Sequence, residues 1–168
     1  MNQGLSPKLE LAFPDIVSIS RPNVKNKKIY SGWMRGFVSA EGCFMVFIQK
    51  PKSHLLKGNL QLGFLVSQHK RDEQLMINML EYFQCGSVYK CRDTFEYRVT
   101  KFSEINEIII PYFKKNPVLG IKSKDFSDFC KIAEMVEKKE HLTQEGFEQI
   151  QKIKAGMNTG RESDKNLC

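Results

Sequence analysis

Two stretches of this chain place apolar side chains at every second position, and a short turn interrupts each stretch once. The first covers residues 43–67 with a turn over 50–58, and the second covers 86–100 with a turn at 92–94. A two-residue period is typical of half-buried strands, so each stretch predicts a hairpin. Helical periodicity precedes, separates and follows the hairpins. The sequence therefore predicts an α+β fold of the order αββαββα, with one antiparallel sheet and helices on one face.

Start signals and apolar stripes indicate where the helices lie. An apolar stripe predicts a helix over residues 70–83, between the two hairpins. After the second hairpin, Ser103 and Thr143 are expected to cap two helices, and a third is expected to start near Ser123.

The helix expected before the first hairpin, residues 30–40, carries small residues at a spacing of four. Gly32, Gly36 and Ala40 therefore lie on one side of it. Small residues allow a second backbone to approach closely, which favours a tight helix–helix contact. The alternative is a buried helix with incidental glycines, each of which costs roughly 1 kcal/mol in a helix interior.

Charge and cysteine usage narrow the classes of function. Lys and Arg number 26 against 19 Asp and Glu, a formal charge of +7. This excess favours a polyanionic partner, most often nucleic acid and less often an anionic membrane, and we expect it on one face of the sheet and its flanking loops. No apolar run approaches a membrane span. The five cysteines form no C-x-x-C pair, which argues against a zinc module and a disulfide framework.

The segment that runs from the glycine-bearing helix into the first hairpin reads Trp33-Met34-Arg35-Gly36-Phe37-Val38-Ser39-Ala40-Glu41-Gly42-Cys43-Phe44. It resembles the motif of the LAGLIDADG homing endonuclease family, with residues 34–42 in the motif positions. Arg35 replaces a small residue and Ser39 replaces the first acid, whereas both glycines and the second acid, Glu41, are kept. Further matches follow in the family's order at residues 66–72, 110–113, 122–124, 141–146 and 153–161.

This resemblance implies a metal-dependent, sequence-specific double-strand DNA endonuclease of the intron-encoded, mitochondrial type. It places the family domain at residues 30–161, after a leader-like or linker-like segment (1–29) and before a tail (162–168). The alternative is a nucleic-acid-binding maturase, or a half-enzyme that needs a partner domain and does not cleave alone.

The motif occurs once, whereas family members pack two motif helices together and take one acid from each. The chain is therefore expected to form a homodimer through Gly32, Gly36 and Ala40 on a near-palindromic site, or to need a separate first-half domain. The opening Met1-Asn2-Gln3-Gly4 is repeated near the other end as Met157-Asn158-Thr159-Gly160. Within the resemblance, this repeat matches the second half of a two-motif enzyme.

Glu41 is the residue to which we assign the central chemistry. A helix that ends at Ala40 gathers carbonyl oxygens and the negative end of the helix dipole around this carboxylate. The position therefore suits Mg²⁺, or another divalent metal such as Mn²⁺ or Ca²⁺, with Glu41 and the carbonyl of Ala40 as oxygen ligands. The alternative is a solvated carboxylate at a helix end.

Supporting catalytic residues follow from the resemblance alone. Gln68 falls where a polar side chain orders water, and Lys122 or Lys124 falls where a lysine stabilises charge in the transition state. Lys122 is preferred slightly, and the alignment leaves both open. The alternatives are a polar residue at a strand end for Gln68, and a phosphate contact or a solvated lysine for the other two.

The sheet is the expected reader of the major groove, where each base pair presents a distinct pattern of donors and acceptors. The outward side chains of the strands are expected to contact bases, with Arg98 suited to guanine: Cys43, Met45, Phe47, Gln49, Asn59, Gln61, Ser67, Ser87, Tyr89, Glu96, Arg98 and Thr100. Phosphate contacts are expected from the flanking basic residues, which are Lys50, Lys52, Lys57, Lys70, Arg71 and Lys90.

Overall fold

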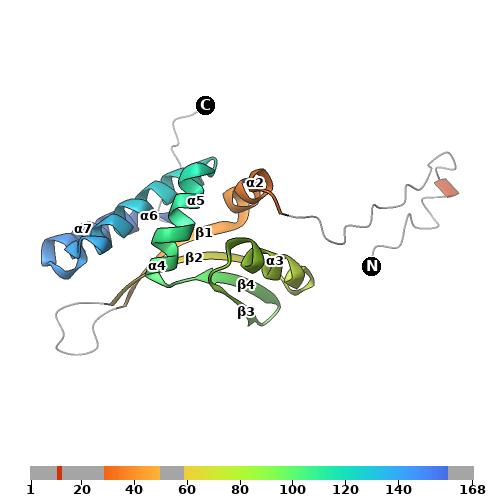
Figure 1. The fold of residues 1–168 in the computed structure, drawn as a ribbon, viewed down its shortest axis with the longest axis horizontal. Helices are drawn as coiled ribbons and strands as arrows, with labels where there is room; N and C mark the ends of the chain where they lie inside the picture. The colour runs from red at the N-terminus through yellow and green to blue at the C-terminus, as the bar shows by residue number, and fades with distance from the viewer. Residues whose placement is uncertain (1–10, 13–28, 50–58, 159–168) are drawn as a thin grey trace.

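The computed structural model describes residues 11–12, 29–49 and 59–158 (Figure 1). The helices are α2 (Ser31–Glu41), α3 (Glu73–Phe83), α4 (Phe102–Glu104), α5 (Ile110–Lys115), α6 (Ile121–Glu137) and α7 (Gln144–Ala155). The strands are β1 (Gly42–Gln49), β2 (Asn59–His69), β3 (Ser87–Cys91) and β4 (Thr94–Val99). This order confirms the predicted α+β class and the αββαββα arrangement. Among the described residues, no helix has the length and apolar character needed to cross a membrane.

The strands form one antiparallel sheet in the order β1-β2-β4-β3. Gly42, the first residue of β1, pairs with Val66 of β2, and β2 continues beyond that pair to His69. The predicted alternation is confirmed, because Phe44 and Phe64 are buried on one face while Phe47 is exposed on the other. The sheet end where α2 enters is therefore also the end where β2 leaves.

An aromatic cluster fills the space between the sheet and its helices. The ring of Phe44 in β1 lies 5.0–5.6 Å, centroid to centroid, from four other rings, those of Phe64, Phe113, Phe126 and Phe129. Phe83 of α3 contacts the rings of Phe64 and Tyr97. These contacts place α3, α5 and α6 over the same face of the sheet (Figure 1). They also anchor the first residues of β1, which directly follow Glu41.

One predicted helix cap is wrong, and the other two predicted helix starts are confirmed. The helix expected from Ser103 begins at Phe102 without a side-chain cap, and it passes through a π-helical segment at Ile105–Ile109. The helix expected near Ser123 begins two residues earlier, at Ile121, and Ser123 donates its hydroxyl to the Gly120 carbonyl in the first turn. Thr143 accepts a hydrogen bond from the Gly146 amide and caps α7 as predicted.

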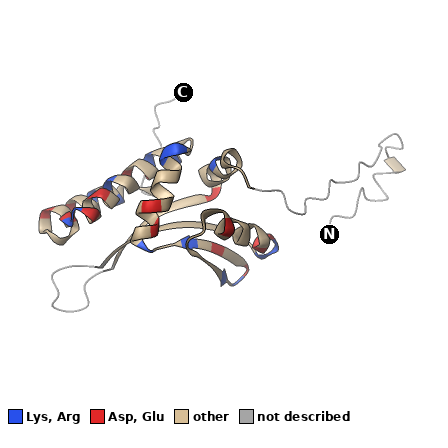
Figure 2. Cartoon of the chain, in the orientation of Figure 1, with Lys and Arg blue, Asp and Glu red and all other residues tan. Residues whose placement is uncertain are grey.

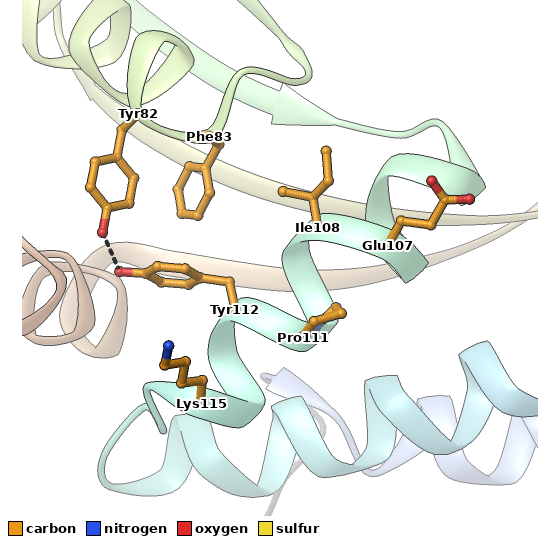
Figure 3. Close-up of a pocket in the computed structure, with 7 residues that line it drawn as sticks. All are labelled: Tyr82, Phe83, Glu107, Ile108, Pro111, Tyr112 and Lys115. Atoms are coloured by element: carbon orange, nitrogen blue, oxygen red, sulfur yellow. Dashed lines mark hydrogen bonds between the residues drawn. The ribbon is translucent and has the colours of Figure 1, made fainter.

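A pocket lies between α3 and the helical segment that ends in α5 (Figure 3). Its lining is mostly apolar and aromatic, with Glu107 and Lys115 among the lining residues. The hydroxyls of Tyr82 and Tyr112 form a hydrogen bond of 3.0 Å, and burial raises the pKa of Tyr112. None of the site residues expected from the sequence lines this pocket, so the candidate site lies elsewhere.

Candidate functional site

The candidate site is built at the α2–β1 junction, residues 38–44, where the helix passes directly into the strand. The Gly42 amide donates a hydrogen bond to the Val38 carbonyl. A Cβ at Gly42 would lie 2.5 Å from Cγ1 of Val38 and 2.7 Å from its carbonyl oxygen, closer than real Cβ atoms approach. Glycine therefore permits this abrupt change from helix to strand, and the change leaves Glu41 exposed as the last helical residue.

The electrostatics at the end of α2 favour a cation. The last turn of α2 contains no basic residue, so no side chain of that turn offsets the negative end of the helix dipole. The final carbonyls of a helix have no partner within it, and Ala40 therefore offers an oxygen beside the Glu41 carboxylate. In the described part of the chain, no three His, Cys, Asp or Glu side chains cluster as a metal site. These two oxygen donors fit Mg²⁺ as a partial ligand set, since Mg²⁺ keeps several waters and takes few protein ligands.

Gln68 lies at the same end of the sheet as Glu41. The strand register pairs Gly42 with Val66, and Gln68 follows Val66 by two residues on the same face of β2. Gln68 itself pairs with Phe95 of β4 and is half-buried. The topology thus brings together two predicted site residues that are 27 positions apart in the sequence.

The structure distinguishes the two candidate lysines. The pKa of the Cys43 thiol is raised, mainly because the thiol is partly buried. The positive charge of Lys122 opposes this rise, and the negative charge of Asp125 adds to it. Lys122 therefore lies close enough to the α2–β1 junction to act electrostatically on a residue two positions after Glu41. Lys124 is exposed and lies about 200° further around α6, so it points to another side of the helix.

Ser39, where the family's first acid is replaced, has a structural role that the sequence did not reveal. Its hydroxyl donates to the Arg35 carbonyl at 2.7 Å and accepts from the Leu119 amide at 2.9 Å. Leu119 belongs to the connection that leads into α6 and Lys122. A helical serine that bonds its own helix is common, whereas the partner in a distant loop has no sequence signal.

The small-residue side of α2 is uncovered within this chain. Gly32, Gly36 and Ala40 are all exposed, and a Cβ placed on Gly36 would meet no atom within 4 Å. Met34 and Val38 are buried, so the helix is buried on one side only and both alternatives for its glycines stay open. The tight helix contact is not made inside the described chain, so it remains a prediction about a partner.

The outer face of the sheet, defined as the side chains opposite the aromatic cluster, follows the predicted parity. Phe47 and Tyr89 are exposed, at 42% and 49%, and Gln61 and Ser87 are exposed beside them. Cys43, Met45, Ser67 and Glu96 are half-buried, and Thr100 lies one residue beyond the end of β4. Several expected contacts lie outside the described residues, namely Lys50, Lys52 and Lys57 and the side chains of Gln49 and Asn59.

Arg98 is held by two neighbours on the outer face. Its guanidinium forms an ion pair with Glu96 and lies 5.3 Å from the centre of the Tyr89 ring. Its Nε is buried, with no hydrogen-bond partner among the described residues. Glu96 and Tyr89, which are also predicted to contact bases, both contact Arg98.

The expectation that the positive excess lies on one face of the sheet and its flanking loops stays a prediction, because Lys50, Lys52 and Lys57 lie outside the described residues. Figure 2 shows Lys and Arg spread over the helices as well as the sheet, and α5, α6 and α7 contain many of them. Lys70 pairs with Asp93 at 2.7 Å and Arg71 lies 3.6 Å from Asp72, whereas Lys90 is exposed on β3. The sequence count alone could not locate this charge, because exposed faces of helices carry lysines for solubility too.

Comparisons with known proteins agree with this arrangement. The profile of the LAGLIDADG endonuclease family matches residues 34–133. The chain is 37% identical over 154 residues to the probable intron-encoded endonuclease 3 of Neurospora crassa, which covers 89% of this chain and 29% of that protein. It superimposes on the LAGLIDADG homing endonuclease I-SmaMI bound to cleaved DNA with a TM-score of 0.80 and 39% identity. The match covers 96% of this chain and 55% of the I-SmaMI chain. With I-SmaMI bound to uncleaved DNA and calcium ions, the TM-score is 0.79 and the identity 39%, and the match covers 94% of this chain and 54% of that chain.

An α+β domain with an exposed acid where a glycine-bearing helix enters an antiparallel sheet is thus the architecture of a known class of proteins. The chain belongs to the LAGLIDADG endonuclease family. It spans 29% of the length of the curated relative and 55% of the solved I-SmaMI chain.

Proposed function

We propose that this chain supplies one half of a metal-dependent, sequence-specific double-strand DNA endonuclease. The observation that carries the proposal is the convergence at one end of the sheet. Glu41 ends α2 there, Gln68 lies near the end of β2 there, and Lys122 acts electrostatically on Cys43 beside them. Because the Neurospora crassa endonuclease and I-SmaMI are both longer than this chain, the activity is proposed for the assembled protein.

Hydrolysis of a phosphodiester needs an activated water and a stabilised leaving oxygen, and a bound divalent cation such as Mg²⁺ supplies both kinds of assistance. In this proposal Glu41 and the Ala40 carbonyl hold the cation. Gln68 orients the water through its side-chain amide. Lys122 places its ammonium where negative charge increases on the phosphate, and Lys124 takes a phosphate contact outside the reacting centre.

DNA recognition is assigned to the outer face of the sheet. A twisted antiparallel ribbon fits the major groove, and the outer face offers donors, acceptors and apolar groups to base edges. Arg98 is the guanine reader in this proposal, and exposed Phe47 meets thymine methyl groups. Lys70, Arg71 and Lys90 contact phosphates and fix the register of the protein on the duplex. The organellar location implied by the resemblance belongs to the same proposal.

The second active-site acid comes from a second motif helix. We propose that a second copy of this chain supplies it, with the exposed side of α2 packed against its counterpart on a near-palindromic DNA site. The support is the exposure of Gly32, Gly36 and Ala40 on a helix whose opposite side is fully packed. A separate first-half domain is the other source of that helix, and it is an outcome of the assembly experiment.

The test of activity uses the full chain with a randomised plasmid library of near-palindromic sites and Mg²⁺. We expect wild type to linearise a subset of plasmids, and Glu41→Gln to cut them at least about a hundredfold more slowly. Loss of residues that merely support a metal ligand already costs about 10–100-fold, and a direct ligand should cost more. Full activity of Glu41→Gln would contradict the assigned role. Binding without cutting in both Mg²⁺ and Mn²⁺ would instead favour the maturase class.

The test of assembly measures mass in solution with and without the selected duplex. Two chains per duplex would support the homodimer, whereas a monomer of 19.5 kDa that gains activity with a first-half domain would support the alternative. Gly36→Leu should abolish the assembly without destabilising the isolated chain, because its side chain points into open space. Ser127→Leu on the exposed side of α6 is the matched control and should leave assembly unchanged.

A further inference from the structure

Asp125 is a buried carboxylate that the proposed chemistry does not use. It lies in α6, three residues after Lys122, and its exposure is 2%. A buried charge is costly unless hydrogen bonds satisfy it, so a carboxylate at this position must have a structural or functional reason. One of its bonds identifies that reason, since Asp125 Oδ1 accepts a hydrogen bond of 3.1 Å from the Asn158 amide.

Asn158 connects this carboxylate to the α2–β1 junction. Its Nδ2 donates to the Phe44 carbonyl at 3.0 Å, and its Oδ1 accepts from the Cys43 thiol at 3.6 Å. β1 lies at the edge of the described sheet, where carbonyls on the outer side have no strand partner, and the Asn158 amide supplies one. The side chain thus gives the Phe44 carbonyl a partner in place of a missing strand, and it also contacts the Cys43 thiol.

The backbone of Asn158 is shaped for this contact. Its φ is +51°, in the left-handed region that asparagine and glycine adopt more readily than other residues. The preceding residue, Met157, is 4% exposed and anchors the segment in the core. The segment after α7 therefore folds back onto the α2–β1 junction with one polar side chain aimed at the strand.

Two connections tie the α2–β1 junction, which carries Glu41, to the region of α6 that carries Lys122. Ser39 in α2 accepts a hydrogen bond from Leu119, which precedes Lys122. Asn158 joins Phe44 to Asp125, which follows Lys122. The lysine is thus bracketed on both sides by bonds to the helix and the strand that flank Glu41.

We propose that Asn158, held by Asp125, is a positioning residue that fixes Glu41 relative to Lys122. This inference rests on the proposed endonuclease function. A displacement of about 1 Å between reacting groups can slow a reaction by about a hundredfold, so a bond that sets their spacing affects the chemical step more than DNA binding.

The informative variant is Asn158→Gly, because glycine tolerates the positive φ and keeps the amide that bonds to Asp125. It removes only the side-chain bonds to Phe44 and Cys43. Gln84→Gly is the matched control, since Gln84 also carries a neutral amide in the left-handed region, with φ +53°, at the end of α3, while its side chain is exposed.

Single-turnover cleavage of the selected plasmid site is measured at saturating protein, together with the Kd for the same duplex. Asn158→Gly should slow cleavage about 10–100-fold with an unchanged Kd, while Gln84→Gly should stay within about threefold of wild type. Cleavage at the wild-type rate by Asn158→Gly would overturn the proposal. An equal loss of cleavage and DNA binding would also overturn it, since that pattern indicates general unfolding.

A second readout does not depend on activity. The rate of Cys43 alkylation by iodoacetamide, followed by mass spectrometry of its peptide, should rise severalfold in Asn158→Gly and stay constant in Gln84→Gly. If wild type binds DNA and cuts none, the proposed function fails, and the Cys43 rate then decides whether Asn158 holds the α2–β1 junction. An unchanged rate overturns the inference in either case.

Discussion

The α2–β1 junction and the outer face of the sheet lie a few residues apart, yet they are built in opposite ways. At the junction, Gly42 touches Val38, and Phe44 is bonded to Asn158 and surrounded by four rings. On the outer face, Phe47 and Tyr89 stand exposed. A region with one permitted geometry fails as a unit, whereas separate exposed contacts contribute in small steps. The difference predicts large, all-or-none effects at the junction and graded effects on the outer face.

The largest effect is expected from Gly42→Ala. The added methyl group would overlap both the Val38 side chain and the Val38 carbonyl, so the strand must move away from the helix. Such overpacking costs about 1–3 kcal/mol, and the movement also displaces Glu41. Urea unfolding should reveal the loss of stability, and cleavage of the selected plasmid should fall at least about a hundredfold.

Gly36→Ala is the matched control for this change, because the same methyl group meets nothing within 4 Å in the same helix. Alanine is the better helix former by roughly 0.5–1 kcal/mol, so the isolated chain should become more stable. Equal destabilisation by the two substitutions would show that the close approach at Gly42 is not what constrains the α2–β1 junction.

An intermediate, base-specific effect is expected from Arg98→Lys on the outer face. Lysine lacks the planar fork that pairs with guanine, and a bidentate pair contributes about 1–3 kcal/mol of discrimination. Kd values are measured for duplexes that each differ from the selected site at one base pair. At a single position, the preference for the original base pair should fall by roughly 5–150-fold. Glu96→Gln, which removes the ion pair and keeps the shape, should weaken the same preference less. Uniform weakening at all positions would instead assign Arg98 to a phosphate.

The smallest effect is expected from Lys70→Ala. Lys70 is exposed and shares an ion pair with Asp93, and exposed pairs contribute only about 0–1 kcal/mol. A lost phosphate contact should weaken binding equally across DNA sequences and reduce the salt-dependence slope by about one. Lys115→Ala, on α5 beside the pocket, is the control and should leave the slope unchanged. A change confined to one base pair would contradict a phosphate role for Lys70.

Much of this architecture was predictable because local patterns repeat. The two-residue period gave both hairpins and the correct inward side of each strand, and the motif placed Glu41 at the end of α2. The cap expected at Ser103 was wrong, because the helix there begins at Phe102 without a side-chain cap, and nothing in the local sequence distinguishes a capping serine from one inside the first turn. The bonds of Ser39 and Asn158 were equally hidden, since their partners lie 80 and 114 positions away.

By itself, the sequence determined the strands, the motif helix and the residue types available for chemistry, because periodicity and short-range spacing are local properties of a chain. Only the tertiary structure decided which lysine acts electrostatically on Cys43, that Arg98 is held by Glu96 and Tyr89, and that Asp125 and Asn158 tie α6 to β1. The physical reason is that these are contacts between side chains on different elements. Their partners are selected by packing around the Phe44 cluster, which no local pattern records.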